Sequence, residues 1–362
     1  MKFPLSPPNF SGVNQEQLMD ALRNCELGKG DEILAHFESD FGTLIGSKNV
    51  VALSSATSGL HLALLALGVS EGDIVICPTF TFAASAFPIV YQKAIPYFID
   101  SEMETWNMSP QYLEEAILKL KANGQKVKAA IIVHSYGNPA RLNELLTICK
   151  ENEIPVIEDA ANALGSTFQN KQVGTFGKIG VFSFNRNKLI SGAGGGCLVT
   201  NDKNIADKVR YLAHQAKSNT PYYQHENIGF NYGLSPILAE IIRLQLPTLA
   251  DRIKERTILQ NQYQDVYKDI AIFQKQCSNA ESNNWLNVAL FDSDEHRNEI
   301  EALTQLLKVE IRRAWKPMHL QPIFTSYNYL GNKESESFFE KAICLPFTNL
   351  LIQNSSMANE IK

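Results

Sequence analysis

The sequence predicts an α/β protein with a mostly parallel central sheet and a smaller C-terminal α+β domain. Between about residues 49 and 200, apolar runs of strand length alternate with helical runs. These strand-like runs are apolar throughout, which is typical of parallel strands that helices cover on both faces. Right-handed crossovers then bring the loops that follow the strands to one edge of the sheet, where open α/β sheets bind ligands.

The alternating region divides into predicted strands and helices in turn. Strands are expected at residues 49–53, 73–77, 95–100, 127–134 and 155–158. Helices are expected at residues 57–68, 82–92, 110–122 and 142–152. A further strand ends in Ser-Phe at residue 184, and another follows the glycine-rich stretch that ends at residue 196.

After residue 201 the alternation stops. Helices are expected at residues 204–215 and 236–246, and a long helix at 249–267 would link two domains. Short strands at 285–291 and 309–313, with a helix at 296–307, suit a small α+β unit. We therefore expect a large ligand-binding domain over residues 1–245, which includes an N-terminal segment. A linker helix and a small domain are expected over residues 246–362.

Composition argues against several classes of function. The 362 residues are 44% hydrophobic and 20% charged with a net charge of −5, so no nucleic-acid partner is expected. The start does not resemble a signal peptide, and no run reaches the roughly 20 apolar residues of a membrane span. The six cysteines and seven histidines are scattered without metal-ligand spacing. This pattern predicts reduced thiols, no metal, no membrane partner and a cytoplasmic protein.

The strongest chemical signal surrounds Lys188. A strand that ends in Ser183-Phe184 precedes this lysine, and a glycine cluster follows it. A lysine that forms an imine must be held rigidly and must lose its proton readily. The alternative is a surface lysine before a glycine-rich turn. A dinucleotide loop is disfavoured, because the glycine spacing is not G-x-G-x-x-G and a strand follows.

Polar and aromatic residues follow three other predicted strands. Asp159 ends a buried strand, where a carboxylate either pairs with a protonated pyridine nitrogen or caps a helix. Thr57 and Ser58 lie in a hydroxyl-rich helix start, which suits an anion, although ordinary capping explains one such residue. Phe82 follows the next strand and either lies on a cofactor ring or belongs to the core. Their order, with the lysine last, favours one cofactor site.

Three motifs carry a resemblance to a known family. They are Ser-Phe-x-x-x-Lys from Ser183 to Lys188, Glu-Asp-Ala-Ala from Glu158 to Ala161, and Gly-Phe-Asn-Tyr from Gly229 to Tyr232. With them the sequence resembles the DegT/StrS-type sugar-nucleotide aminotransferases, which are fold-type-I enzymes that use pyridoxal 5'-phosphate (PLP). The likeness extends over residues 5–346, almost the whole chain.

The resemblance implies a role for each residue that would meet the PLP ring. Lys188 would be the catalytic Schiff-base lysine, and Asp159 would bind the pyridine nitrogen. Phe82 would stack on the ring. Asn162 stands where the family usually has glutamine and would contact the phenolic oxygen.

The resemblance also implies a shared phosphate site. Thr57, Ser58 and Ser183 would hold the phosphate from one chain. Asn231 would reach the phosphate of the neighbouring subunit, so the implied assembly is a homodimer with shared active sites.

The segment from Trp315 through Lys316 to His319 resembles the branch that makes 4-amino-4,6-dideoxy sugars. It implies that these three residues contact the substrate, although Trp315 could instead only pack between domains. The implied reaction moves an amino group from glutamate to C4 of a nucleotide-linked 4-keto-6-deoxy sugar, with a UDP-linked N-acetylhexosamine preferred, for a bacterial surface glycan. Two alternatives remain, a GDP-4-keto-6-deoxymannose aminotransferase of the perosamine type and a catalytically silent PLP-fold regulatory or binding protein.

Overall fold

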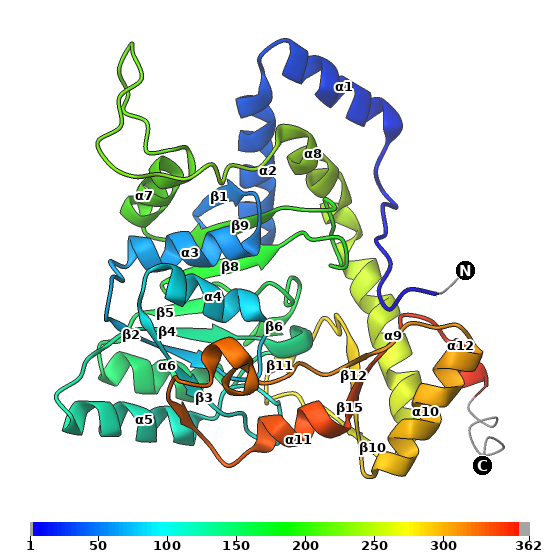
Figure 1. Cartoon of the computed structure of the whole chain (residues 1–362). Coiled ribbons are helices and arrows are strands. Elements are labelled where there is room, and N and C mark those ends of the chain that lie inside the picture. The colour runs from blue at the N-terminus through cyan, green and yellow to red at the C-terminus, as the bar shows by residue number, and fades with distance from the viewer. Residues whose placement is uncertain (1–2, 355–362) are drawn as a thin grey trace.

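A computed structural model describes residues 3–354, and an eight-stranded sheet organises most of them (Figure 1). All strand pairs in this sheet are parallel except those made by β9, which runs antiparallel to both of its neighbours. The predicted mostly parallel α/β sheet is therefore confirmed. In order across the sheet, the strands are β1 (Asn49–Leu53), β9 (Gly196–Thr200), β8 (Ile179–Ser183), β5 (Val156–Asp159), β4 (Val127–Val133), β2 (Ile74–Pro78), β3 (Ile95–Ile99) and β14 (Tyr329–Leu330).

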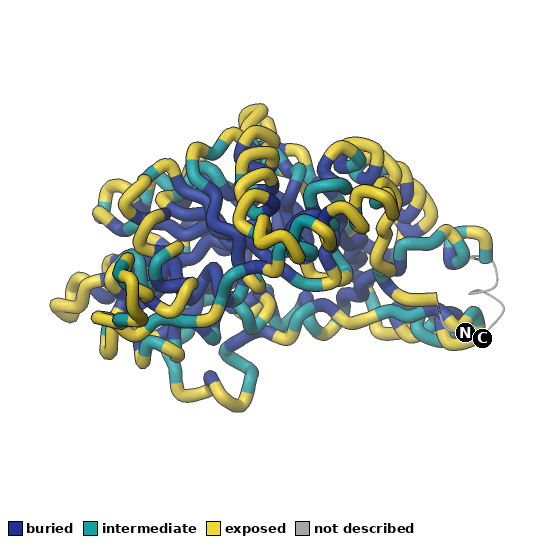
Figure 2. Tube along the Cα trace, turned by 90° about the horizontal axis from the view of Figure 1, so that it is seen from above, coloured by how far each residue is buried: buried dark blue, intermediate teal, exposed yellow. Residues whose placement is uncertain are grey.

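Helices cover both faces of this sheet, because its inner strands are apolar on both faces. In β1, Val51 and Leu53 pack in the cluster that includes apolar residues of α3 (Ala56–Ala66), α4 (Ala83–Tyr91) and α7 (Lys203–Ala213). Val50 and Ala52 pack in the opposite cluster. That cluster draws on α2 (Gly30–Ile45), α5 (Pro110–Ala122), α6 (Leu142–Glu151) and α8 (Pro236–Gln245). Figure 2 shows that the buried part of the trace lies in the interior of the molecule and the exposed part around it.

Two N-terminal helices, α1 (Gln15–Glu26) and α2, lie outside the elements expected from the sequence. In α2 the residues Ile33, Phe37, Phe41 and Ile45 are buried at helical spacing. Phe37 and Phe41 also meet the ring of Phe184 edge-on, at centroid distances of 5.6 and 5.4 Å. This helix therefore supports the chain between β8 and the glycine cluster.

The long helix α9 (Leu249–Tyr267) is followed by a second, four-stranded sheet. Tyr263 and Tyr267 of α9 belong to the apolar cluster that this sheet forms with its helices. The order of its strands is β10 (Ala271–Phe273), β12 (Asn287–Phe291), β15 (Ala342–Leu345) and β13 (Arg312–Arg313), and its helices are α10 (Asp294–Leu306), α11 (Glu334–Lys341) and α12 (Leu350–Gln353). One segment of this part of the chain, β14, instead extends the large sheet beside β3, which the sequence pattern did not indicate.

A small three-stranded sheet and four short 3₁₀ turns complete the described chain. The sheet has β11 (Ala280–Glu281), β6 (Thr167–Phe168) and β7 (Lys171–Gln172), and the turns are η1 (Ser135–Gly137), η2 (Leu246–Thr248), η3 (Met318–Leu320) and η4 (Pro322–Phe324). From residue 3 to residue 354, none of the helices combines the length and the apolar character that crossing a bilayer requires. Over the same range, no group of three or more His, Cys, Asp or Glu side chains could hold a metal ion. The six cysteines are all free thiols.

The closest backbone approach in the sheet gives a prediction about stability. A Cβ atom on Gly180 of β8 would lie 1.8 Å from the carbonyl oxygen of Gly174. Gly180→Ala is therefore expected to lower the free energy of unfolding by about 2 kcal/mol or more, because backbone must move. The matched control is Gly194→Ala, whose Cβ would meet nothing nearer than 3.9 Å and is expected to cost at most about 0.5 kcal/mol. Equal unfolding midpoints in urea for the two variants would contradict this view of the sheet.

Candidate active site

A cavity with a volume of about 580 Å³ opens at the carboxyl ends of β1, β5 and β8. This is the edge where parallel sheets bind ligands, and the volume suits a cofactor-sized molecule. Its lining brings together most of the residues that the sequence pointed to. They are Thr57, Phe82, Asp159, Asn162, Ser183, Lys188 and Trp315.

Lys188 follows β8 and points its Nζ into the cavity between two side chains. The Nζ donates a hydrogen bond to Oδ1 of Asn162 and lies 3.8 Å from the centroid of the Trp285 ring. Burial lowers the pKa of Lys188 from 10.5 to about 7, and the negative charge of Asp159 opposes that shift. An amine with this pKa is substantially unprotonated at neutral pH, which is the form that attacks a carbonyl carbon.

Hydrogen bonds from three distant segments fix the backbone on both sides of Lys188. The carbonyl of Asn187 accepts from the Trp285 indole at 2.8 Å and from the Ser6 hydroxyl at 3.2 Å. The carbonyl of Leu189 accepts from the guanidinium of Arg252 on α9. These bonds remove much of the freedom that a glycine-rich loop would otherwise have.

A second arginine of α9 forms hydrogen bonds with Ser6 and Trp285, the two residues that bond the carbonyl of Asn187. Arg256 donates to the carbonyl of Trp285 at 3.0 Å and to the hydroxyl of Ser6 at 3.2 Å. Burial lowers the pKa of Arg256 to about 10, which still leaves the side chain charged at neutral pH. The guanidinium therefore anchors the N-terminal segment and the indole against the same cavity wall.

Asp159 ends β5 and is almost fully buried, with 5% of its surface exposed. Its Oδ2 accepts from the Ser85 hydroxyl at 2.7 Å, and its Oδ1 accepts from the N–H of Ala161 at 3.1 Å. Burial nevertheless raises the pKa of Asp159 above its ordinary value. A buried carboxylate of this kind gains stability from a cationic partner in the cavity.

The amino end of α3 forms the opposite part of the cavity wall. Ser55 caps this helix, accepting from the N–H of Ser58 at 3.0 Å. The N–H groups of Ala56 and Thr57 lie in the first turn, where no helical carbonyl precedes them, and both residues line the cavity. Backbone donors at a helix start attract anions. The hydroxyl of Ser58 donates to the carbonyl of Ser55 at 2.8 Å and lies outside the lining, so it completes the cap rather than facing the cavity.

Aromatic rings form another part of the cavity wall. The ring of Phe82, 63% exposed, borders the cavity after β2. Trp315 stacks on Tyr136 with a centroid distance of 4.0 Å, and Tyr136 in turn lies parallel to Trp285 at 6.4 Å. The stack joins Trp315 to the ring beneath Lys188.

Comparison with known proteins agrees with this geometry. Residues 11–358 match the family described as the DegT/DnrJ/EryC1/StrS aminotransferase family. The chain belongs to that family. It is 40% identical to the Bacillus subtilis protein named "Putative pyridoxal phosphate-dependent aminotransferase EpsN", over 95% of this chain and 90% of that one.

A second relative and a solved structure extend the comparison. The GDP-perosamine synthase of Escherichia coli O157:H7 is 33% identical over 96% of this chain and 93% of its own. The crystal structure of a DegT DnrJ EryC1 StrS aminotransferase from Brucella abortus superposes with a TM-score of 0.85 at 27% identity, covering 96% of this chain and 94% of that chain. The fold-type-I prediction is confirmed, and so is the prediction of a PLP-dependent sugar aminotransferase.

The residues of this DegT-family cavity fit PLP on their own chemistry. The raised pKa of Asp159 is typical of a buried carboxylate that lacks a full cationic partner. The protonated pyridine nitrogen of PLP would be such a partner. The first turn of α3 supplies anion donors, and Lys188 supplies an amine with a pKa of about 7.

The sequence assigned Ser58, Lys316 and His319 to this aminotransferase site, but none of them lines the cavity, and it assigned Asn231 to the site of the neighbouring subunit. Lys316 is exposed and does not line the cavity. The Nδ1 of His319 is 2.7 Å from the Thr79 hydroxyl, and its ring stacks on Tyr329 at 3.8 Å, so it fastens the segment after Trp315 to the end of β2. Asn231 is exposed and is absent from the cavity of its own chain.

The structure adds cavity residues that the sequence reasoning missed. Arginines 186, 312 and 313 line the cavity and give it a cationic side. The N-terminal residues 4–8 form another wall, through contacts nearly 200 residues or more away in sequence. The three arginines left a local signal that could have been noticed, because Arg186 lies inside the Ser183–Lys188 motif and Arg312-Arg313 lies beside the Trp315 motif.

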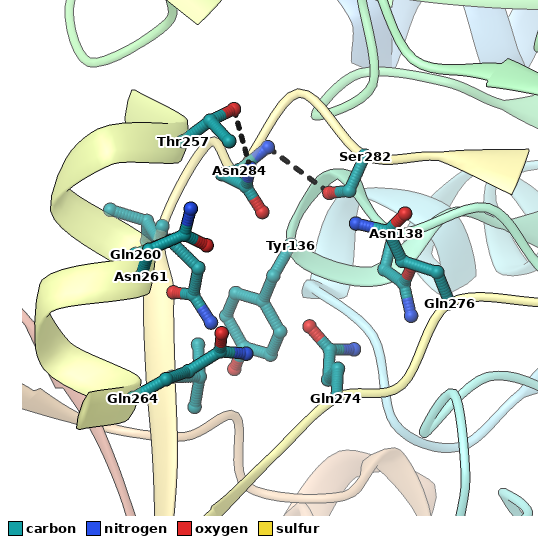
Figure 3. Close-up of a pocket in the computed structure, with 12 residues that line it drawn as sticks. Tyr136, Asn138, Thr257, Gln260, Asn261, Gln264, Gln274, Gln276, Ser282 and Asn284 are labelled. Carbon is teal, nitrogen blue, oxygen red and sulfur yellow. Dashed lines mark hydrogen bonds between the residues drawn. The ribbon is translucent and has the colours of Figure 1, made fainter. Parts of the chain in front are cut away.

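A second, smaller cavity lies behind Tyr136 (Figure 3). Its volume is about 80 Å³, and its lining is dominated by carboxamides, with no charged side chain. They are Asn138, Gln260, Asn261, Gln264, Gln274, Gln276 and Asn284. Because it offers neither an amine nor a carboxylate, the chemistry of this aminotransferase belongs to the larger cavity.

The pKa of Lys188 gives a prediction for the PLP-free enzyme. Acylation of Lys188 by an amine-selective reagent should rise with pH with a midpoint near 7, because only the neutral amine reacts. Since the charge of Asp159 raises this pKa, Asp159→Asn should move the midpoint to lower pH. Peptide mass spectrometry across a pH series measures both. A midpoint near 10 would contradict the burial of this amine, and an upward shift in the variant would contradict the effect of the Asp159 charge on its pKa.

Proposed function

We propose that this sugar aminotransferase moves an amino group from glutamate to C4 of a nucleotide-linked 4-keto-6-deoxy sugar. The observation that carries the proposal is the pairing of an amine with a pKa near 7 and a buried carboxylate in one cavity, Lys188 and Asp159. A transamination site needs both, one to exchange with the substrate amine and one to stabilise the pyridinium form of PLP.

We assign to five residues of the cavity, and to the first turn of α3, a role in binding PLP. Thr57, Ser183 and the first turn of α3 would bind the phosphate, since backbone donors and hydroxyls favour an anion there. Asp159 would pair with the pyridine nitrogen, Phe82 would stack on the ring, and Asn162 would contact its phenolic oxygen. Bound PLP supplies an electron sink for the charge that develops on the substrate carbon.

Lys188 is proposed to carry the proton. Once its amine is free, Nζ takes the proton from Cα of the amino donor and afterwards returns one, so it serves as base and acid in turn. The Oδ1 of Asn162 and the ring of Trp285 hold that Nζ in place. A pKa near 7 suits both directions of transfer at neutral pH.

Glutamate as donor and the nucleotide as recognition group are both anionic, which suits the cationic side of the cavity. Arg312 is exposed and bonds Glu310 at 3.1 Å, and Arg313 lies 3.5 Å from Glu301. Arginine forks bind phosphates well. We assign the diphosphate to these arginines and the sugar to the wall made by Trp315.

A UDP-linked N-acetylhexosamine is our proposed substrate, from the likeness of the Trp315 segment to the 4-amino-4,6-dideoxy-sugar branch. The second candidate is GDP-4-keto-6-deoxymannose. It is favoured by the 33% identity to the GDP-perosamine synthase of Escherichia coli O157:H7. Product analysis with each nucleotide sugar and glutamate decides between them, since both proposals share the same chemistry.

Arg312 and Arg313, which we call the rim arginines, give a prediction that separates the two half-reactions. Arg312→Ala and Arg313→Ala should weaken the sugar half-reaction by about tenfold in apparent affinity, the lower part of the range for a bond to a charged group. The glutamate half-reaction should change less. Lys316→Ala is the matched control, because it removes a nearby cation that does not line the cavity.

Stopped-flow absorbance of the enzyme-bound PLP, followed separately with each substrate, measures these effects. Loss of the sugar half-reaction in Lys316→Ala but in neither arginine variant would overturn the assignment to the rim. Loss of both half-reactions to the same extent would mean that the arginines support the cavity generally.

We further propose a homodimer with shared sites, in which Asn231 serves the cavity of the partner. Support comes from the segment before it, which projects from the body in Figure 1 and exposes Tyr222, Tyr223 and Ile228 at 65%, 83% and 87%. Exposed apolar side chains on one segment are typical of a protein contact.

Mixed dimers test this sharing. Asn231→Ala should lose PLP more readily than wild type, and Lys188→Ala should be inactive. A dimer of one chain of each kind should regain activity at one of its two sites, because that site would carry neither lesion. Activity of co-refolded heterodimers, isolated through two different affinity tags, gives the answer. Heterodimers with no activity would place both residues in the same subunit's site.

A further inference from the structure

Asp159 is reached by a chain of two buried hydroxyls. The hydroxyl of Thr81 lies 2.7 Å from that of Ser85, and the hydroxyl of Ser85 donates to Oδ2 of Asp159 at 2.7 Å. Both hydroxyl residues are 1% exposed and both border the cavity. The hydrogen-bonded chain from Thr81 through Ser85 to Asp159 is therefore shielded from bulk water.

The direction of the hydrogen bonds follows from what a carboxylate can do. An ionised carboxylate only accepts, so the proton of Ser85 points to Asp159. Ser85 must then accept from Thr81, and both hydroxyl dipoles point the same way. Hydrogen bonds aligned in a chain strengthen one another, most of all where the local dielectric is low.

The same serine also belongs to the turn that carries the aromatic wall. Ser85 lies in the first turn of α4, and its N–H donates to the carbonyl of Phe82 at 3.0 Å. The side chain of Ser85 thus bonds Asp159, which is proposed to pair with the ring nitrogen. The backbone N–H of Ser85 bonds Phe82, which is proposed to stack on the ring.

We propose that Ser85, supported by Thr81, is a positioning residue that fixes the carboxylate of Asp159 and keeps it ionised for the pyridine nitrogen. This inference rests on the proposed role of Asp159. Ser85 itself transfers no proton to substrate and acts only through the carboxylate.

The charges around Asp159 agree with that role. Burial raises the pKa of Asp159, and the Ser85 hydroxyl is the strongest influence lowering it, ahead of the N–H of Ala161 and the charges of Lys188 and His134. The thiol of Cys77 on β2 also faces this carboxylate, and burial with the charge of Asp159 raises its pKa, so it stays neutral. Loss of Ser85 would therefore remove the largest single support for the ionised form.

The test uses PLP labelled with ¹⁵N in the ring, bound to the whole enzyme. Ser85→Ala removes one hydroxyl with little change in volume, and it should move the ring-nitrogen signal toward unprotonated pyridine, because the stronger base at Asp159 then keeps the proton. The affinity of the PLP-free enzyme for PLP should fall about tenfold. Ser85→Thr should restore both, and Thr81→Val should shift both less and in the same direction.

Ser335→Ala is the matched control. Its hydroxyl also donates to a buried carboxylate, that of Asp100, but neither residue lines the cavity. This variant should lose stability and leave the ring-nitrogen signal and PLP affinity unchanged. If Ser85→Ala does not fold, Thr81→Val carries the same test.

The outcomes separate this inference from the proposed function. Wild-type ring-nitrogen signals in Ser85→Ala and Thr81→Val, with a shifted signal in Asp159→Asn, would overturn the positioning role alone. A wild-type signal in Asp159→Asn would mean that the ring nitrogen is not paired with Asp159, and the proposed cofactor arrangement would fail with it. Equal shifts of the ring-nitrogen signal in Ser85→Ala and Ser335→Ala would mean that the shift reports a general loss of stability and not the position of Asp159.

Discussion

Removal of water from one lysine and one aspartate is the constraint on which the rest of the site depends. Burial disfavours the charged form of both, lowering the pKa of Lys188 to about 7 and raising that of Asp159. Such burial is costly unless other groups compensate it. The hydroxyl chain at Asp159 and the Asn162 and Trp285 contacts at Lys188 supply that compensation. Burial thus gives the amine of Lys188 a lower pKa, and the carboxylate of Asp159 a higher pKa, than either group has in water.

The architecture brings these two groups together from separate strands. Asp159 ends β5 and Lys188 follows β8, and the two strands are neighbours that run parallel. A parallel sheet places such strand ends at one edge. The helix α9 and the N-terminal segment then close the wall through Arg252, Arg256 and Ser6. This member of the DegT family therefore uses far more of the chain than the motif around Lys188 to fix the position of that lysine.

Local pattern was enough to predict strands β1 to β5 and to point to residues that the structure gathers around one cavity. Apolar runs between residues 49 and 158 correspond to strands β1 to β5 within one residue at most ends, because burial on both faces leaves a strong signal. Strand β14 escaped prediction because Tyr329–Leu330 is short. Its place depends on parallel pairing with β3 and on the bond from Tyr329 to Asp100 at 2.6 Å. The contact between His319 and Thr79 could not be predicted either, since only the folded chain brings these two residues together.

The central claim is that Lys188 is the amine that binds PLP, and borohydride reduction tests it most directly. Reduction of the PLP-bound enzyme followed by proteolysis and mass spectrometry should find the added pyridoxyl mass on the peptide that contains Lys188. Lys188→Ala should lose that adduct while keeping its fold by circular dichroism. An adduct on another lysine in the wild type, or an undiminished adduct in Lys188→Ala, would contradict the account.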